Sequence, residues 1–507
     1  MFARLRARSA SALLGRRLPL AVLLVTQALF SLWWAAFYPG LMSYDSISYV
    51  WHVTTGHWMA NHSVAYDGLV WLSLRLTGDL GALTLAQTAA MSATLAYAAC
   101  ALRDLGARPI AAGVAAVAIP VIPATGSFVV TIWKDVPFTV CAVLASATLA
   151  RLVARRTTAA VTLLGAELCG MVIFRNNGFL FVAIAAPIIV GLLPGIRRRL
   201  LVATGTPLLV AFTLTGAVFP ALGIPGAPPS LTYATAYGDV AVAFKRARSS
   251  FTPRDTEVMA RVAPLSHWRR SADCHTTDPT TQRPGFAAAA DTQNAELVAL
   301  WGRVVRRTPA LVAAVRLCRG AIAWDIAGGP GLSARTAIHG VGVPDDLFGW
   351  ARWNAEMRVS PYRPILAPRP LSAPLREAVT AFREASRAPW LEWLLWRGAF
   401  WCYLAYAVVL AGVRRHRAVP VVAALVLGQQ LGVLLANPAQ LYRYMVAPTV
   451  VSVLLLALVP ARGGRRPYGG PGRTPGSPGR DAARRGGPRG AEGGVSRGGG
   501  AGTRATV

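Results

Sequence analysis

Apolar and polar residues alternate along this chain in long blocks. Runs of about twenty largely apolar residues, the length of a helix that crosses a bilayer, are separated by short segments rich in arginine. The pattern predicts an α-helical polytopic membrane protein with about ten spans. We expect these spans near residues 18–37, 79–102, 109–125, 136–153, 158–174, 177–194, 200–219, 394–413, 418–435 and 444–460.

The cations between these runs predict the topology. Alternate connections hold Arg103 and Arg108; Arg151, Arg155 and Arg156; Arg197, Arg198 and Arg199; Arg414, Arg415 and Arg417. The other short connections hold only Lys134, Arg175 and Arg443. Because basic loops stay in the cytoplasm, we expect a multi-pass plasma-membrane protein with both termini cytoplasmic. A cleaved signal peptide is the competing interpretation of 18–37, but no small-residue cleavage site follows it.

Two connections on the predicted extracytoplasmic side are long. The first covers about residues 38–78, and the second, 221–393, is long enough for an extracytoplasmic domain between spans 7 and 8. The second contains "TPALVAAVRLCRGAIAW", which has Arg316 and Arg319 in an apolar run. We expect an amphipathic helix on the membrane or the bundle there. The remaining divisions are a basic N-terminus 1–17, spans 18–220 and 394–460, and a tail 461–507.

Composition agrees with a membrane protein, since 54% of the residues are hydrophobic and 15% are charged. The net charge of +30 would indicate nucleic acid in a soluble chain, but here it lies between spans and in the tail. We therefore expect the lipid bilayer, and no nucleic acid, as a partner. The tail is rich in Gly, Pro and Arg and has too few apolar residues for a core, so it should be disordered.

The cysteines leave one question open. Cys274 and Cys318 both fall in the segment 221–393, where an oxidising compartment would allow a disulfide. The sequence does not show whether they approach each other. The other four lie in predicted spans, and no CxxC or other zinc spacing occurs: Cys100, Cys141, Cys169 and Cys402.

One carboxylate follows the first span, in "YPGLMSYDSISY". Pro39-Gly40 ends the span, and the apolar residues of 47–54 then recur at helical spacing, as in a short helix lying flat in the interface. Asp45, or Ser43 before it, is suited to cap that helix. The alternative is that Asp45 carries chemistry at the membrane surface, and the two roles are compatible.

Three cations stand where the topology disfavours them: Lys134 in "TIWKDVPF", Arg175 in "FRNNGF" and Arg443 in "NPAQLYRYMVAP". Local pairing, most obviously of Lys134 with Asp135, or snorkelling to headgroups would explain them. The functional interpretation is that they converge on an anion such as a lipid phosphate, for which the arginine fork is well suited.

Polar side chains near these positions are candidates for substrate contacts. His57 and His62 would converge with Asp45 if Gly56 breaks the helix, although bonds to backbone or solvent are the ordinary role of such histidines. Asn176 and Asn177 are suited to bond sugar hydroxyls. Glu167 falls in mid-span, where an acid is usually paired or functional.

The layout resembles the GT-C superfamily of integral membrane glycosyltransferases, which includes the protein O-mannosyltransferases and the aminoarabinose transferases of lipid A. The resemblance is carried by "YPGLMSYDSISYVWHVTTGHWMANHSVAY", followed by "WKDVPF", "RNNGFL" and "QLYRY". It implies a first outer loop of helices parallel to the membrane, whose Asp acts at the active site, here Asp45. No DxD or ExD pair surrounds that residue, so no cofactor is indicated, and a divalent metal stays an open alternative.

We therefore expect a glycosyltransferase that moves a sugar from a polyprenyl-phosphate donor to an extracytoplasmic acceptor, with inversion. Asp45 would be the base, and the three disfavoured cations would bind the donor phosphate. The residues expected beside the substrate are Tyr44, His57, His62, Asn176, Asn177 and Tyr442. A transporter or flippase, and a membrane scaffold, are the alternatives, and the acceptor can be a protein, a lipid or a glycan.

Overall fold

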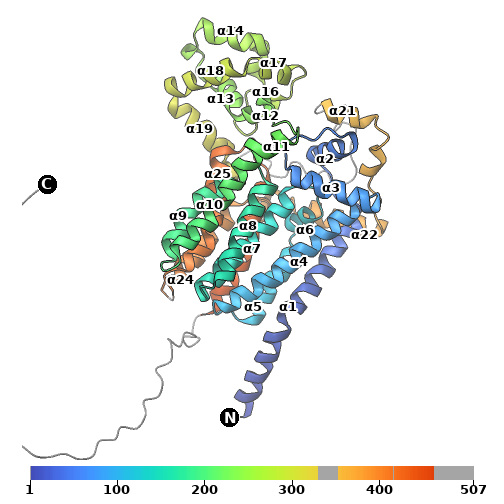
Figure 1. Ribbon diagram of the computed structural model, residues 1–507, viewed down its shortest axis with the longest axis vertical. Coiled ribbons are helices and arrows are strands. Elements are labelled where there is room, and N and C mark those ends of the chain that lie inside the picture. The colour runs from blue at the N-terminus through green and yellow to red at the C-terminus, as the bar shows by residue number, and fades with distance from the viewer. Residues whose placement is uncertain (1, 329–351, 415, 462–507) are drawn as a thin grey trace, which may run out of the picture. The chain divides into compact units, whose positions relative to one another are not determined.

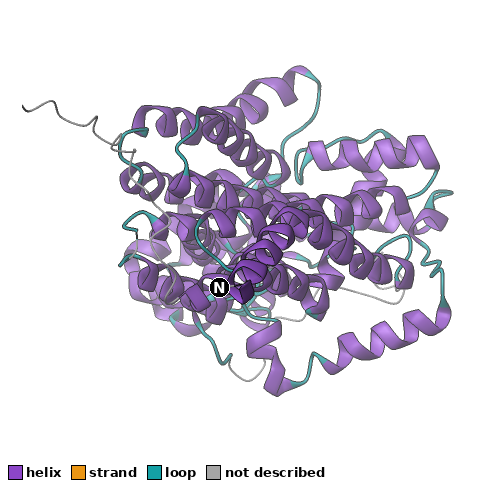
Figure 2. Cartoon of the chain, turned by 90° about the horizontal axis from the view of Figure 1, so that it is seen from below, coloured by secondary structure: helices purple, strands orange, loops and turns teal. Residues whose placement is uncertain are grey.

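The structure, a computed structural model, describes residues 2–328, 352–414 and 416–461, and most of these residues lie in helices (Figure 1). Within these ranges no strand forms, and three isolated bridges are the only β-type pairings (Figure 2). The predicted α-helical class is confirmed. The predicted disordered tail, apart from Ala461, and part of the segment 221–393 lie outside the described residues.

Among the residues that the structure describes, six helical segments are long and apolar enough to cross a membrane, or up to eight if two bent pairs each count as one span. The six are Arg17–Ala36 in α1 (Phe2–Ala36), α4 (Gly81–Asp104), α7 (Asp135–Ala154), Arg197–Ala221, Val419–Ala436 and Tyr442–Val459. The bent pairs are α5 (Pro109–Val121) with α6 (Pro123–Val129), and α23 (Pro389–Leu395) with α24 (Ala399–Gly412). Two shorter apolar helices, α8 (Thr158–Phe174) and α9 (Gly178–Leu192), match the remaining predicted spans.

Three of these spans consist of more than one helical element. They are α10 (Arg197–Thr213) with η1 (Leu214–Val218) and α11 (Phe219–Ala221); η5 (Val419–Ala423) with α25 (Ala424–Ala436); η6 (Tyr442–Met445) with α26 (Val446–Leu455) and η7 (Leu456–Ala461).

The two long connections form shorter helices. The first connection forms α2 (Tyr44–Thr55) and α3 (Val64–Thr77). The second forms α12 (Pro229–Thr232), α13 (Ala234–Arg246), η2 (Arg248–Ser250), α14 (Pro253–Val262), α15 (Leu265–Arg270), α16 (Asp278–Thr281), α17 (Phe286–Thr292), α18 (Asn294–Arg307), α19 (Pro309–Arg319), α20 (Ala321–Trp324), α21 (Arg352–Arg358), η4 (Arg363–Leu366) and α22 (Ala373–Ala385).

Figure 1 shows α2, α3 and the helices α12 to α18 at one end of the bundle, opposite the start of α1. We call this the loop end. The helix α2 forms where the apolar spacing predicts it, and its apolar face points into the protein. Ile47, Val50 and Trp51 are buried in the protein core, and α2 packs on α3 and α21. The connection is therefore a part of the folded core.

A sharp bend between α5 and α6 brings the next segment to α2. Ile122 has an extended conformation because Pro123 follows it, and the two helices differ in direction by 72°. The chain after α6 then pairs with the end of the first span, where the backbone of Leu41 bonds that of Val130 and Ile132. At Gly40, with φ of 155°, a Cβ would lie 2.9 Å from the Val130 carbonyl oxygen.

Residues 222–328 have a hydrophobic core of their own around α13. Its largest buried members are Tyr237, Phe244, Trp268, Phe286 and Leu300. The run containing α19 is not a span. Arg316 and Arg319 both pair with Asp239 of α13, at 2.6 and 2.8 Å, and α19 packs against α25. This agrees with the predicted amphipathic helix on the bundle.

Candidate active site

Four segments that are distant in the sequence bring a cluster of charged side chains together at the loop end. Asp45 comes from the first turn of α2, Lys134 and Asp135 from the start of α7, Arg175 from the residue after α8, and Arg443 from η6. Arg443 pairs with Asp45 and lies 3.8 Å from Asp135, which pairs with Arg175 at 3.0 Å. The three disfavoured cations therefore converge with Asp45. We call these five residues the charged cluster.

Asp45 is a member of this cluster and not the helix cap. The N-cap residue of α2 is Ser43, whose backbone N–H donates to the Ser46 hydroxyl at 2.9 Å. Burial alone would raise the pKa of Asp45, but the charges of Arg443 and Lys134 lower it by more, to well below its usual range. Asp45 is consequently an ionised partner of Arg443.

Lys134 does not pair with its neighbour Asp135, so the local explanation of this cation is wrong. Its Nζ donates to Nδ1 of His62 at 2.6 Å. Burial lowers the pKa of Lys134, and burial together with the nearby Lys134 lowers that of His62 well below its usual value. Since an ammonium group can only donate, Nδ1 of the neutral His62 accepts and its proton lies on Nε2.

Aromatic rings hold the two guanidinium groups. The Tyr444 ring centroid lies 4.7 Å from Cζ of Arg175 and 5.1 Å from Cζ of Arg443. Arg443 also lies over Trp133 at 5.0 Å, and Nε of Arg175 donates to Asn177 Oδ1 at 2.8 Å. Cation–π contacts and these bonds restrain both forks in a largely buried setting.

The predicted substrate residues divide into two groups. His62 and Asn177 bond cations of the cluster, and Tyr44 stands half-buried beside Asp45 at the start of α2. The others contact different parts of the chain. His57 is exposed and stacked on Trp51. Asn176 donates to the Ala60 carbonyl at 3.0 Å, and Tyr442 is buried against Trp396.

Sequence reasoning missed Asp135 and Tyr444 as members of the site. In the sequence Asp135 stands out only as a possible local partner of Lys134, whereas in the structure it lies between the two arginines. Tyr444 carries the same signal as Tyr442, since both flank Arg443 in "QLYRY". Glu167, the acid in mid-span, accepts from the Thr148 hydroxyl at 2.8 Å, away from the cluster.

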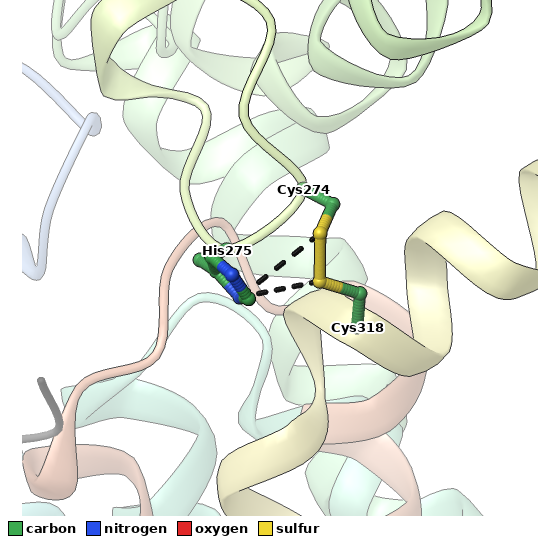
Figure 3. Close-up of side chains that lie close together, drawn as sticks. All are labelled: Cys274, His275 and Cys318. Atoms are coloured by element: carbon green, nitrogen blue, oxygen red, sulfur yellow. Dashed lines mark hydrogen bonds between the residues drawn. A yellow bond between two sulfur atoms is a disulfide. The ribbon is translucent and has the colours of Figure 1, made fainter. Parts of the chain in front are cut away.

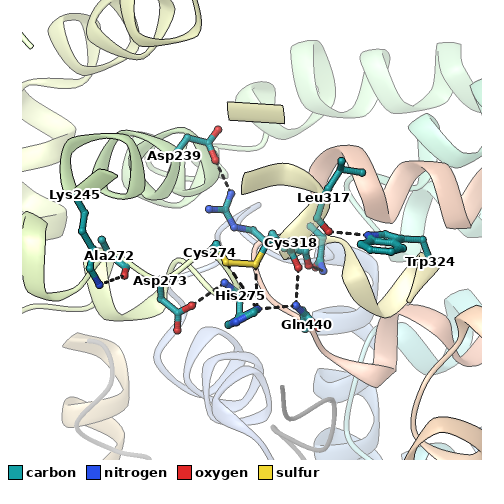
Figure 4. Close-up of a disulfide and its surroundings, with 12 residues drawn as sticks. Asp239, Lys245, Ala272, Asp273, Cys274, His275, Leu317, Cys318, Trp324 and Gln440 are labelled. Atoms are coloured by element: carbon teal, nitrogen blue, oxygen red, sulfur yellow. Dashed lines mark hydrogen bonds and ion pairs between the residues drawn. A yellow bond between two sulfur atoms is a disulfide. The ribbon is translucent and has the colours of Figure 1, made fainter. Parts of the chain in front are cut away.

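A disulfide between Cys274 and Cys318 fixes the segment that faces the Arg443 loop (Figure 3). Gln440, three residues before Arg443, joins the two sides. Its Nε2 donates to the Cys318 carbonyl at 2.6 Å and lies 3.1 Å from His275 Nδ1 (Figure 4). Thr277 N–H donates to the Pro438 carbonyl at 3.0 Å. Hydrogen bonds from both sides of the disulfide therefore couple residues 222–328 to the loop that presents Arg443.

Two further features lie near this disulfide: a group of possible metal ligands and the carboxylate of Asp278. Cys274, His275 and Cys318 are close enough together to suggest a metal site, but both sulfurs are consumed in the disulfide. Asp278, at the start of α16, lies near enough to the cluster for its charges to act on this residue. Desolvation raises the pKa of Asp278; Arg443 lowers it and Asp45 raises it.

Comparison with known proteins leaves the family open. No protein-family model matches the chain, and no curated protein matches it. Among solved structures, the chain is similar to a crystal structure of ArnT from Cupriavidus metallidurans bound to undecaprenyl phosphate, with 15% identity and a TM-score of 0.32 over 86% of this chain and 77% of that one. A likeness at this level carries no functional argument, so the function has to be argued from the site itself.

Proposed function

We propose that the chain is an integral membrane glycosyltransferase of the GT-C type that its sequence resembles. It transfers a sugar from a polyprenyl-phosphate donor to an acceptor on the extracytoplasmic side, with inversion. The observation that carries the proposal is the gathering of Lys134, Arg175 and Arg443 around two carboxylates, Asp45 and Asp135, at the ends of apolar helices. The phosphate of a membrane lipid lies in the headgroup region, where apolar spans end, so a cluster at the ends of such helices is placed for it.

The cluster is suited to a phosphate that gains charge as it departs. Its three cations exceed its two carboxylates, and the guanidinium groups of Arg175 and Arg443 offer paired donors. Asp45 and Asp135 hold these donors in the structure. A donor phosphate would replace Asp45 as the partner of Arg443, so the cations would take the part that a metal ion plays beside a DxD pair.

The same exchange would activate Asp45. The pairing with Arg443 is the strongest interaction that lowers its pKa, and transfer of Arg443 to the phosphate would remove much of it. The carboxylate would then accept the acceptor's hydroxyl proton while that oxygen bonds to the anomeric carbon. The bond from that carbon to the phosphate oxygen breaks on the opposite side, which inverts the centre and releases polyprenyl phosphate.

The test is release of polyprenyl phosphate by protein reconstituted in lipid, with a panel of polyprenyl-phosphate sugars and candidate acceptors. We expect release by wild type and none by folded Asp45→Asn. Asp79→Asn is the matched control, because Asp79 pairs with Arg369 outside the cluster. Release by Asp45→Asn at the wild-type rate would contradict the assignment. Movement of labelled lipid across the bilayer without release would favour a flippase.

A further inference from the structure

The charged cluster continues into a polar face of α2. Asp45, Tyr49 and His52 follow one another at helical spacings of four and three residues, so they share one side of the helix. Tyr49 and His52 are both 0% exposed. Polar atoms at such positions are nearly always hydrogen-bonded, because an unpaired buried donor or acceptor is costly.

Two atoms on this face depart from that rule. Neither the Tyr49 hydroxyl nor Nε2 of His52 has a hydrogen-bond partner among the residues that the structure describes. His52 uses its other nitrogen, since Nδ1 lies 2.9 Å from Oδ2 of Asp67 on α3. That contact fixes the ring and leaves Nε2 as the group without a partner.

The rings around these atoms hold them in place next to the cluster. Tyr49 packs edge-on against His62 and Tyr66, with ring centroids 5.2 and 4.9 Å away. His62 lies 6.4 Å from the His52 ring and bonds Lys134. His62 is half-buried and adjoins Lys134 as well as the two rings that carry the unpaired atoms.

We propose that Tyr49 and His52 form a hydroxyl-binding subsite that takes a sugar ring beside the phosphate-binding cations. The inference rests on the proposed function, which places a sugar next to its phosphate. Its own support is the chemistry of the site: two hydrogen-bonding groups set among aromatic rings, which suit a sugar ring with hydroxyl edges and apolar faces. The sugar can belong to the donor or to a glycan acceptor.

A matched pair of tyrosines allows the test. Tyr66 is equally buried, but its hydroxyl donates to Gln87 Oε1 at 2.8 Å, and Gln87 in turn donates to the Val129 and Thr131 carbonyls. We would compare Tyr49→Phe with Tyr66→Phe by melting temperature and by affinity for a polyprenyl-phosphate sugar and for polyprenyl phosphate alone. Tyr49→Phe should leave the melting temperature unchanged or raise it, because it removes an unpaired hydroxyl, whereas Tyr66→Phe should lower it.

The affinities and the KM for the acceptor show whether the bound sugar belongs to the donor or to a glycan acceptor. If the donor sugar is bound, Tyr49→Phe weakens binding of the sugar-bearing donor about tenfold and leaves binding of polyprenyl phosphate unchanged. If a glycan acceptor is bound, donor binding is unchanged and the KM for the acceptor rises. Unchanged donor binding together with an unchanged acceptor KM would overturn the subsite. Failure of wild type to bind polyprenyl phosphate more tightly than Arg443→Gln would instead overturn the proposed function.

Discussion

Arg443 and Asp45 are 398 residues apart in the sequence and form an ion pair in which the side chains are only 14% and 10% exposed. The pair joins η6, where the last described span begins, to the first turn of α2, the helix that follows the first span. It therefore closes the helical bundle at the loop end, and it places a carboxylate and a guanidinium group at one point. The ion pair stabilises the fold, and in the proposed mechanism it also holds the base. Experiments can separate its effect on stability from its effect on activity.

A double-mutant cycle on this pair separates stability from activity. Asp45→Asn and Arg443→Gln should each lower the free energy of unfolding by about 3 kcal/mol, because each leaves a mostly buried charge without its partner. The double variant should lose clearly less than the sum, with a coupling of about 2 kcal/mol. Activity should stay absent in all three. Additive losses in denaturant unfolding would show that the two side chains do not interact as the structure has them.

The pH dependence of stability should reveal the neutral His62. Its pKa is lowered in the folded state by burial and by Lys134, so the unfolded chain binds a proton first. The free energy of unfolding should therefore fall as the pH drops below about 6.5, the ordinary value for histidine, and be restored above it. Asp45, whose folded-state pKa is also lowered, should add a further loss only below about pH 4.

Thermal melts of detergent-solubilised protein between pH 7.5 and 5, taken in steps of about half a unit, check this prediction. His62→Gln should flatten the profile, since the amide oxygen can still accept from Lys134 but does not titrate. His57→Gln is the control, because His57 is exposed and its Nδ1 contacts the hydroxyl of the nearby Thr55. An equal flattening by both variants would show that titration of His62 is not the cause of the pH dependence of stability.

The sequence could predict the cations of the site because their positions oppose the topology. Lys134, Arg175 and Arg443 each fall in a connection where the predicted topology disfavours a cation, and this distinguishes them before any fold is known. The partners could not be predicted in this way. Lys134 and Asp135 are adjacent, so pairing is the natural expectation, but Asp135 begins α7 and its carboxylate faces Arg175 and Arg443.

The choice between neighbouring side chains also depends on geometry that the sequence does not contain. Tyr442 and Tyr444 lie two residues apart in a 3-10 helix, where they point in different directions. Only the packing of η6 decides that Tyr444 faces the arginines. Likewise Gly56, in the left-handed region with φ of 75°, turns the chain so that His57 stacks on Trp51 and His62 reaches Lys134.

Loss of the disulfide should weaken donor binding more than it weakens the membrane bundle. Replacing Cys274 and Cys318 by Ser frees the segment that holds Gln440, and hence the loop of Arg443. We expect a several-fold rise in the KM for the donor and a loss of about 3 kcal/mol in the stability of residues 222–328. Hydrogen exchange and donor kinetics measure the two effects.

Cys100→Ser provides the control for this change, since Cys100 is a free and half-buried cysteine of α4. The double serine variant should still insert into membranes and retain its helical content. An unchanged donor KM in a variant whose residues 265–282 exchange faster would show that the loop is positioned without the disulfide. Reduction of the wild type should reproduce the effect of the two serines.

Tyr444 should matter to donor binding mainly through its ring, because the bond that its hydroxyl accepts from Arg443 Nη2 is long, at 3.3 Å. The ring lies within about 5 Å of both guanidinium groups, and two cation–π contacts of about 1 kcal/mol each are involved. Tyr444→Leu should therefore raise the donor KM about tenfold or more, whereas Tyr444→Phe, which keeps the ring, should change it less than about threefold. Tyr442→Leu is the matched control: it removes a buried ring that packs on Trp396, so it should lower the melting temperature without a comparable change in KM. Equal KM effects of the two leucine variants would mean that general packing of η6, and not the grip on the arginines, sets donor affinity.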